Sequence, residues 1–241
     1  MMRFLFALIV ALCSAQSAFA AVAVDATSTS TGSGGSTLSW SHTVSGSNTL
    51  LICSAHISSG SAVSTFRFNS VDLTLKSSHP SSASTYFVEM WYLIAPASGT
   101  HTVALTLSGG ADNTVAGCTS FTGADQASPI GTASFNGVND DVEDFPPTIT
   151  VPSGGIAYDV VFFGNSSGAC ASSTPGGSQT KRFDDCVGSA GFNATGASST
   201  RGTSGTMNWL NLSGALGSQI AVPISAPSAT SIVRRKPVIF Q

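Results

Sequence analysis

Charged residues are scarce in this chain. Lys, Arg, Asp and Glu together make up 9% of its 241 residues, and the formal net charge is −3. Binding to the phosphate backbone of nucleic acids requires clustered Lys and Arg, so this shortage argues against a nucleic-acid partner. The hydrophobic fraction is nonetheless 42%. Low net charge combined with that hydrophobic content excludes an intrinsically disordered chain.

Long apolar runs and helical patterns are also missing. No stretch reaches the roughly 18 consecutive apolar residues that suggest a membrane-spanning helix. Gly, Ser and Thr interrupt every candidate for an amphipathic helix, in which apolar residues recur with a period of 3.6. We therefore expect no transmembrane segment, and no long helix beyond the N-terminal region.

The first residues have the three parts of a secretory signal peptide. Arg3 supplies positive charge, residues 4–11 form a short apolar run, and Ala18 and Ala20 form an A-x-A cleavage site. We predict cleavage after Ala20. The mature protein would then be secreted, extracellular or displayed on a cell surface.

Cysteine is rare, and Cys13 would leave with the signal peptide. The remaining four allow three pairings. We pair Cys170 with Cys186, which flank one Gly/Ser-rich stretch. We pair Cys53 with Cys118, which lie in apparent strands beside small residues. Buried free thiols are the alternative. No C-x-x-C motif occurs, which disfavours a redox or zinc site.

Short strand patterns are abundant. Apolar stretches separated by turn residues predict about eleven strands. Residues 49–57 and 85–95 are apolar on both faces, which is typical of central strands. Within residues 71–76, the alternation predicts that Val71, Leu73 and Leu75 face inward. The expected strands are residues 37–44, 49–57, 63–68, 71–76, 85–95, 102–107, 115–121, 148–151, 156–163, 205–212 and 219–224.

Eleven strands in a chain of domain size must pack as two sheets or close into a barrel. We predict an all-β, two-sheet jelly-roll sandwich. Two long stretches, residues 123–147 and 165–204, are expected to be irregular loops, and such loops on a β scaffold tend to carry binding residues. The expected organisation is a signal peptide at 1–20, a flexible lead-in at 21–36, the sandwich at 37–225 and a basic C-terminal tail at 226–241.

Four sequence segments spread over most of the chain carry a family resemblance. They are Ser45–Leu51 (SGSNTLL), Val88–Pro96 (VEMWYLIAP), Ser120–Pro129 (SFTGADQASP) and Ser204–Leu210 (SGTMNWL). In them the chain resembles bacterial and bacteriophage proteins with concanavalin-like jelly-roll domains. The resemblance implies a secreted or surface-displayed sandwich that binds glycans or other proteins. The basic tail is similar to tails on some phage structural proteins, which keeps a virion role open.

The densest acidic cluster is formed by Asp140, Asp141, Glu143 and Asp144. Oxygen-rich loops in exported proteins can hold Ca²⁺, which takes six to eight oxygen ligands. These four residues are therefore our candidate calcium ligands. Their spacing does not match an EF-hand, and a solvated acidic loop is the alternative.

Catalytic patterns are incomplete. Residues 164–168 match G-x-S-x-G, but the sequence that follows cannot start a helix and every histidine precedes Ser166. Glu89 and Asp159 could form the carboxylate pair of a glycosidase, yet the E-x-D-x-x-E pattern of jelly-roll glucanases is absent. The three tryptophans lie in apolar strands, which favours core packing over sugar stacking. We assign no catalytic residue.

The sequence thus predicts an exported, non-enzymatic binding module. It would recognise carbohydrate, a cell surface or a matrix partner through loops of a β-sandwich. The first alternative is a structural subunit of an extracellular assembly or phage virion, and the second is a glycoside hydrolase. The expected partner is a glycan or surface protein, the oligomeric state is left open, and calcium is the one cofactor considered.

Overall fold

The computed structural model describes residues 20–58, 61–80, 86–110, 113–135, 146–165, 170, 172–189, 192–210 and 216–228. All regular structure within these ranges is β-strand. That part of the chain holds no helix of the length and hydrophobicity that a bilayer crossing requires. The strands are β1 (Ala23–Ser33), β2 (Thr37–Val44), β3 (Leu50–Ser58), β4 (Val63–Phe68), β5 (Val71–Asp72), β6 (Thr74–Pro80), β7 (Tyr86–Ile94), β8 (Gly99–Leu107), β9 (Asn113–Thr122), β10 (Ser134–Phe135), β11 (Thr148–Ile149), β12 (Ile156–Asn165), β13 (Thr174–Pro175), β14 (Thr180–Ser189), β15 (Phe192–Arg201), β16 (Gly205–Thr206), β17 (Trp209–Leu210) and β18 (Leu216–Ile224).

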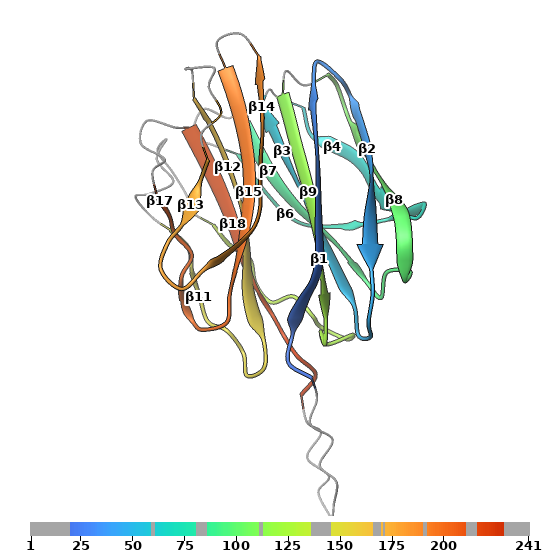
Figure 1. Ribbon diagram of the computed structural model, residues 1–241, viewed down its shortest axis with the longest axis vertical. Helices are drawn as coiled ribbons and strands as arrows, with labels where there is room; N and C mark the ends of the chain where they lie inside the picture. The colour runs from blue at the N-terminus through green and yellow to red at the C-terminus, as the bar shows by residue number, and fades with distance from the viewer. Residues whose placement is uncertain are drawn as a thin grey trace, which may run out of the picture.

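Three large antiparallel sheets lie in three layers (Figure 1). The middle sheet has the strand order β1-β9-β3-β7-β6. The C-terminal sheet, with the order β10-β18-β12-β15-β14, packs on one of its faces. The N-terminal sheet, with the order β2-β8-β4-β5, packs on the other. Two short ladders pair β11 with β16 and β13 with β17.

Two hydrophobic cores separate these layers, and β3 contributes to both. Successive side chains of a strand point to opposite faces. Leu50 and Ile52 therefore join the core under the C-terminal sheet, whereas Leu51 and Cys53 join the core under the N-terminal sheet. Every residue of β3 is buried. This explains why the sequence pattern of a central strand is apolar on both faces, as expected for residues 49–57 and 85–95.

The all-β class and the packing of antiparallel sheets are confirmed. The expected number of sheets is wrong, because three large sheets stack where two were predicted. The strands that are apolar on both faces, β3 and β7, were expected to be central within their sheet. They also belong to the middle of three layers, so each of their two faces packs against a core. The described pairings do not establish a jelly-roll strand order, which stays a prediction.

The lead-in predicted at residues 21–36 contains β1 instead. β1 pairs with β9 along the edge of the middle sheet, from Ala23 opposite Thr122 to Ser33 opposite Asn113. Its Ser- and Thr-rich sequence has no apolar alternation because an edge strand of this sheet is only partly covered: all of its residues are half-buried or exposed. The sandwich therefore begins before residue 37.

The irregular stretch predicted at residues 165–204 is also wrong, because it contains β14 and β15. Both pair within the C-terminal sheet. Small residues dominate here since the layers approach closely. A Cβ on Gly117 of β9 would lie 2.6 Å from the ring of Phe183 on β14. Such contacts leave no room for the large apolar residues that reveal a strand in a sequence.

Residues 71–76 form two strands in two layers rather than one. β5 pairs with β4 in the N-terminal sheet, and β6 pairs with β7 in the middle sheet. Leu73, between them, is buried as predicted. Val71 and Leu75 are 50% and 45% exposed, which contradicts the expectation that they face inward.

Both predicted disulfides are present. Cys53 and Cys118 face each other across β3 and β9, with their Cα atoms 4.0 Å apart. The Cα atoms of Cys170 and Cys186 are 5.9 Å apart. On the loop-entropy model, closing these loops stabilises the fold by about 4 and about 3 kcal/mol respectively. Two disulfides fit an oxidising environment outside the cytoplasm.

Candidate functional site

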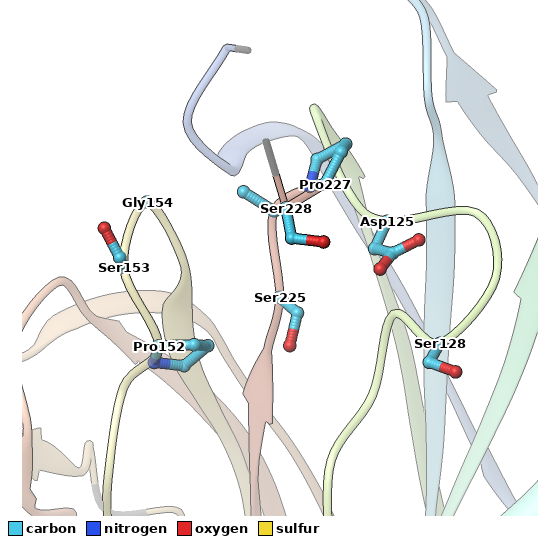
Figure 2. A pocket seen from close by; sticks show the side chains of 9 residues that line it. Asp125, Ser128, Pro152, Ser153, Gly154, Ser225, Pro227 and Ser228 are labelled. Atoms are coloured by element: carbon cyan, nitrogen blue, oxygen red, sulfur yellow. The ribbon is translucent and has the colours of Figure 1, made fainter. Parts of the chain in front are cut away.

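A hollow in the described part of the chain lies at one end of the sandwich. Three segments form its wall: the loop after β9, the turn before β12 and the chain that leaves β18 (Figure 2). Its volume is about 660 Å³. The lining residues are Asp125, Ser128, Pro152, Ser153, Gly154, Ser225, Ala226, Pro227 and Ser228. We call it the Asp125 hollow.

Backbone hydrogen bonds hold the three segments in place. The amide of Asp125 donates to the carbonyl of Ser225, and the amide of Ser225 donates to the carbonyl of Pro129, both at 2.8 Å. The amide of Val22 donates to the carbonyl of Gly154, also at 2.8 Å. The hollow is thus built on paired backbone rather than on free loops, which preorganises its side chains.

Among the described residues that line this hollow, Asp125 is the only ionisable one. Its Oδ1 accepts a hydrogen bond of 2.9 Å from the amide of Ala127, which fixes the side chain in a local turn. Figure 2 shows the carboxylate beside Ser225 and Ser228, on the chain that leaves β18. The arrangement offers a carboxylate acceptor, serine hydroxyls that both donate and accept, and apolar proline rings.

A second, smaller hollow of about 200 Å³ shares Ser128 with the first. It lies between the loop after β9 and the edge of the middle sheet. Its lining consists of Lys76, Tyr92, Ile94, Ala127, Ser128, Pro129 and Ile130. We call it the Lys76 hollow.

The amino-acid sequence does not predict either hollow. The segment at residues 120–129 contains Asp125 and Ser128, but its pattern is that of a structural signature of strands and corners. The available signal was local: Asp two residues before Ala127 in a Gly-containing loop indicates a side-chain-stabilised turn. Nothing in the sequence indicates that residues 152–154 and 225–228 lie beside that turn.

The predicted calcium ligands Asp140, Asp141, Glu143 and Asp144 lie outside the described residues, so the calcium hypothesis stays a prediction. In the ranges that the structure describes, no group of three or more His, Cys, Asp or Glu could hold a metal ion. Ser166 of the G-x-S-x-G match also lies outside those ranges.

Glu89 and Asp159 are buried in different layers. Glu89 lies between the middle and N-terminal sheets, where Oε2 accepts a 2.9 Å hydrogen bond from Nε1 of Trp91 and Oε1 accepts one from the amide of Val63. Burial raises its pKa. Asp159 lies on β12, on the side of the C-terminal sheet that faces away from the core under that sheet. The middle and C-terminal sheets separate the two carboxylates, so they cannot act together on one sugar.

Asp159 is the centre of a buried polar cluster on the outer face of the C-terminal sheet. Oδ1 accepts from the amide and the hydroxyl of Ser199, at 2.9 and 2.6 Å. Oδ2 accepts from Nε1 of Trp209 at 2.8 Å and from Nε2 of Gln219 at 2.6 Å. Burial raises the pKa of Asp159 to about 6, although these four donors favour the ionised form. The cluster fastens β17 onto the sheet.

The interpretation of the tryptophans as core residues is confirmed. Trp209 is 1% exposed and packs with Val161 and Phe163 of β12. Trp40 and Trp91 are half-buried and pack against the core under the N-terminal sheet. None of the three lines either hollow.

No protein-family model matches this chain, and comparisons with curated proteins and with solved structures return no match. The resemblance to concanavalin-like bacterial and phage proteins therefore stays a prediction.

Proposed function

We propose that this protein is an exported, non-enzymatic binding module that recognises carbohydrate in the Asp125 hollow. One observation carries the proposal: a preorganised hollow of about 660 Å³ combines a single carboxylate with several serine hydroxyls and two prolines. A jelly-roll relationship to concanavalin-like domains remains part of this proposal.

The chemistry of the lining matches a sugar. A carboxylate can accept hydrogen bonds from two hydroxyls of one sugar ring, and serine hydroxyls serve as donor or acceptor as the ligand requires. Pro152 and Pro227 offer apolar surface to the carbon face of the ring. Binding sites commonly combine apolar lining with a few placed polar groups. The described lining of the hollow contains one carboxylate and no basic side chain, so the hollow favours neutral polyhydroxylated ligands over anionic ones.

A binding role is better supported than glycoside hydrolysis. Hydrolysis normally requires two carboxyl groups about 5–9.5 Å apart on either side of the bond that breaks. The Asp125 hollow contributes one among its lining residues. The two carboxylates that the sequence suggested as a pair lie buried in separate layers and away from both hollows.

The test is binding of the purified protein to an array of neutral and acidic oligosaccharides. Asp125→Asn keeps an oxygen that can accept from the amide of Ala127, so the fold is retained while the charge is lost. We expect at least tenfold weaker binding, the effect of one charge-assisted hydrogen bond. The matched control is Asp72→Asn, an exposed carboxylate paired with Arg67 on the N-terminal sheet, which should bind as the wild type does.

Repeating the array in calcium and in excess chelator tests the acidic loop at the same time. Chelator-sensitive binding would support the prediction that Asp140, Asp141, Glu143 and Asp144 hold calcium. An array on which no glycan binds would overturn the proposal.

One observation favours a structural subunit as the second candidate. The outer face of the N-terminal sheet carries an array of exposed hydroxyl side chains on β2 and β8. Such a weakly charged face could pack against a second copy. Size-exclusion chromatography with light scattering distinguishes the two candidates, because a subunit of an assembly should form defined oligomers.

A further inference from the structure

The Lys76 hollow has a different chemistry from the Asp125 hollow beside it. Lys76 contributes an ammonium group, Tyr92 contributes an aromatic ring with a hydroxyl, and Ser128 lies in the wall of both hollows. Ile94 and Ile130 provide apolar walls. A positive hollow and a negative hollow are therefore adjacent, and Ser128 is common to both.

A β-bulge positions Lys76. In the pairing of β6 with β7, Leu75 lies opposite Trp91 and Ser77 lies opposite Met90, so Lys76 is the extra residue. A bulge redirects a side chain and disrupts the regular ladder at that point. Here it allows Lys76 to line the same hollow as Tyr92, which packs against the core under the C-terminal sheet.

Lys76 has no carboxylate partner in the part of the chain that the structure describes. The two salt bridges found there join Arg67 to Asp72 and Lys181 to Asp184. Lys76 is half-buried beside the apolar walls of the hollow. In a partly desolvated site an ammonium attracts an anion more strongly than it does in open water. The hollow is thus suited to one negatively charged group.

We propose that the Lys76 hollow is a subsite for an anionic unit of the saccharide bound in the Asp125 hollow, with Lys76 facing its carboxylate or sulfate group. This inference rests on the proposed carbohydrate-binding function and narrows the ligand to an acidic oligosaccharide. The bound saccharide crosses Ser128, so that a neutral sugar unit lies beside Asp125 and the acidic unit lies beside Lys76. Like-charge repulsion from Asp125 sets this orientation.

The test compares matched pairs of oligosaccharides by calorimetry: a uronic-acid oligosaccharide with its carboxyl-reduced form, and a sulfated one with its desulfated form. The pairs are chosen so that the neutral member of each already binds the protein on the oligosaccharide array. We expect the wild type to bind the acidic member of at least one pair about tenfold more tightly. The pair that shows the preference identifies the group as carboxylate or sulfate. Molar salt should reduce the preference, because it screens charges beyond about 3 Å.

Lys76→Met removes the charge and keeps the length of the side chain. It should lower the preference for the acidic member to less than twofold while leaving affinity for the neutral member unchanged. The matched control is Lys181→Met on β14, which packs near β1 and β9 at the opposite edge of the middle sheet from β6. It removes the same charge from the protein and should leave the preference intact.

The outcomes separate the two proposals. Equal binding of acidic and neutral members by the wild type, or an acidic preference that survives in Lys76→Met, overturns the Lys76 subsite. The proposed function still stands if Asp125→Asn abolishes binding of both members. If Asp125→Asn leaves both affinities unchanged, the proposed function fails instead.

Discussion

The two outer sheets occupy equivalent positions on the middle sheet, but their outer faces differ. On the C-terminal sheet, β17 covers the outer face around Asp159, and we call β17 the cover. The exposed fractions there are 0% for Asp159, 0% for Gln219 and 1% for Trp209 of the cover itself. The outer face of the N-terminal sheet carries exposed Thr43 and Thr100 in open contact with solvent. The same layer position thus supports a buried polar cluster on one side and a solvated hydroxyl surface on the other.

The difference shows how little of this fold depends on charge. With few ionisable residues available, the chain uses one buried carboxylate to attach a short cover, because that group can accept several hydrogen bonds at once. The solvated face needs no such anchor, since water satisfies each exposed hydroxyl. Substitutions on the two faces should therefore differ widely in their effect on stability.

The largest effect is expected for Trp209→Ala. The change removes a fully buried indole and also one donor to Asp159. Truncating a buried aromatic residue and leaving part of a buried acceptor unsatisfied should lower the free energy of unfolding by about 5 kcal/mol. Urea unfolding measures the change. A loss below about 1 kcal/mol would mean that the cover is only loosely attached to the sheet.

Asp159→Asn tests the electrostatics beneath the cover. Burial raises the pKa of Asp159 from 3.8 to about 6. A carboxyl whose pKa is raised by folding contributes most stability below pH 3.8, and that contribution is lost as the pH rises through about 6. The stability difference between wild type and Asp159→Asn should therefore shrink by up to about 3 kcal/mol from pH 4 to pH 7.

Comparing the wild type with Asp159→Asn isolates the contribution of the Asp159 carboxyl to the pH dependence of stability. Burial lowers the pKa of His42 to about 4 and that of His56 to about 3, so both destabilise the fold in acid. They do so equally in wild type and variant, and their effect cancels. A stability difference that grows with pH would show that the four donors keep Asp159 ionised throughout.

Trp91→Ala extends the contrast to the core under the N-terminal sheet, against which Trp91 packs from β7 of the middle sheet. Trp91 is half-buried, packs against the core under the N-terminal sheet and donates a hydrogen bond to Glu89. We expect a loss of about 2 kcal/mol, because less surface is buried than at Trp209. Thermal unfolding and glycan binding should be measured together. Lost binding with an unchanged melting temperature would identify Trp91 as a ligand contact instead of a core residue.

The sequence predicted the strands whose burial produces a pattern and missed those whose burial does not. β2 and β4 have the predicted bounds because each alternates apolar and polar residues. β1, β14 and β15 are built from Ser, Thr, Gly and a few large residues, so hydrophobic periodicity does not mark them. The disulfides were predictable since Cys53 and Cys118 lie in recognisable strands.

The candidate site was not predictable, for a tertiary reason. Asp125, Pro152 and Ser225 belong to segments that are distant in the sequence and become neighbours only through the hydrogen bonds at the end of the sandwich. A chain rich in serine gives no local reason to select these hydroxyls. The carboxylates that did attract attention, Glu89 and Asp159, are buried and hold the fold together.

The smallest effect is expected for Thr43→Val combined with Thr100→Val. The two hydroxyls share one exposed hydrogen bond of 2.8 Å, and valine keeps the β-branched shape that strands favour. Because both hydroxyls are exposed to water in the folded protein as well as in the unfolded chain, removing them should change the free energy of unfolding by no more than about 0.5 kcal/mol. Light scattering should show the same mass for variant and wild type. A shift in mass would mean that this face packs against another copy, which would favour the structural-subunit alternative over a solvated surface.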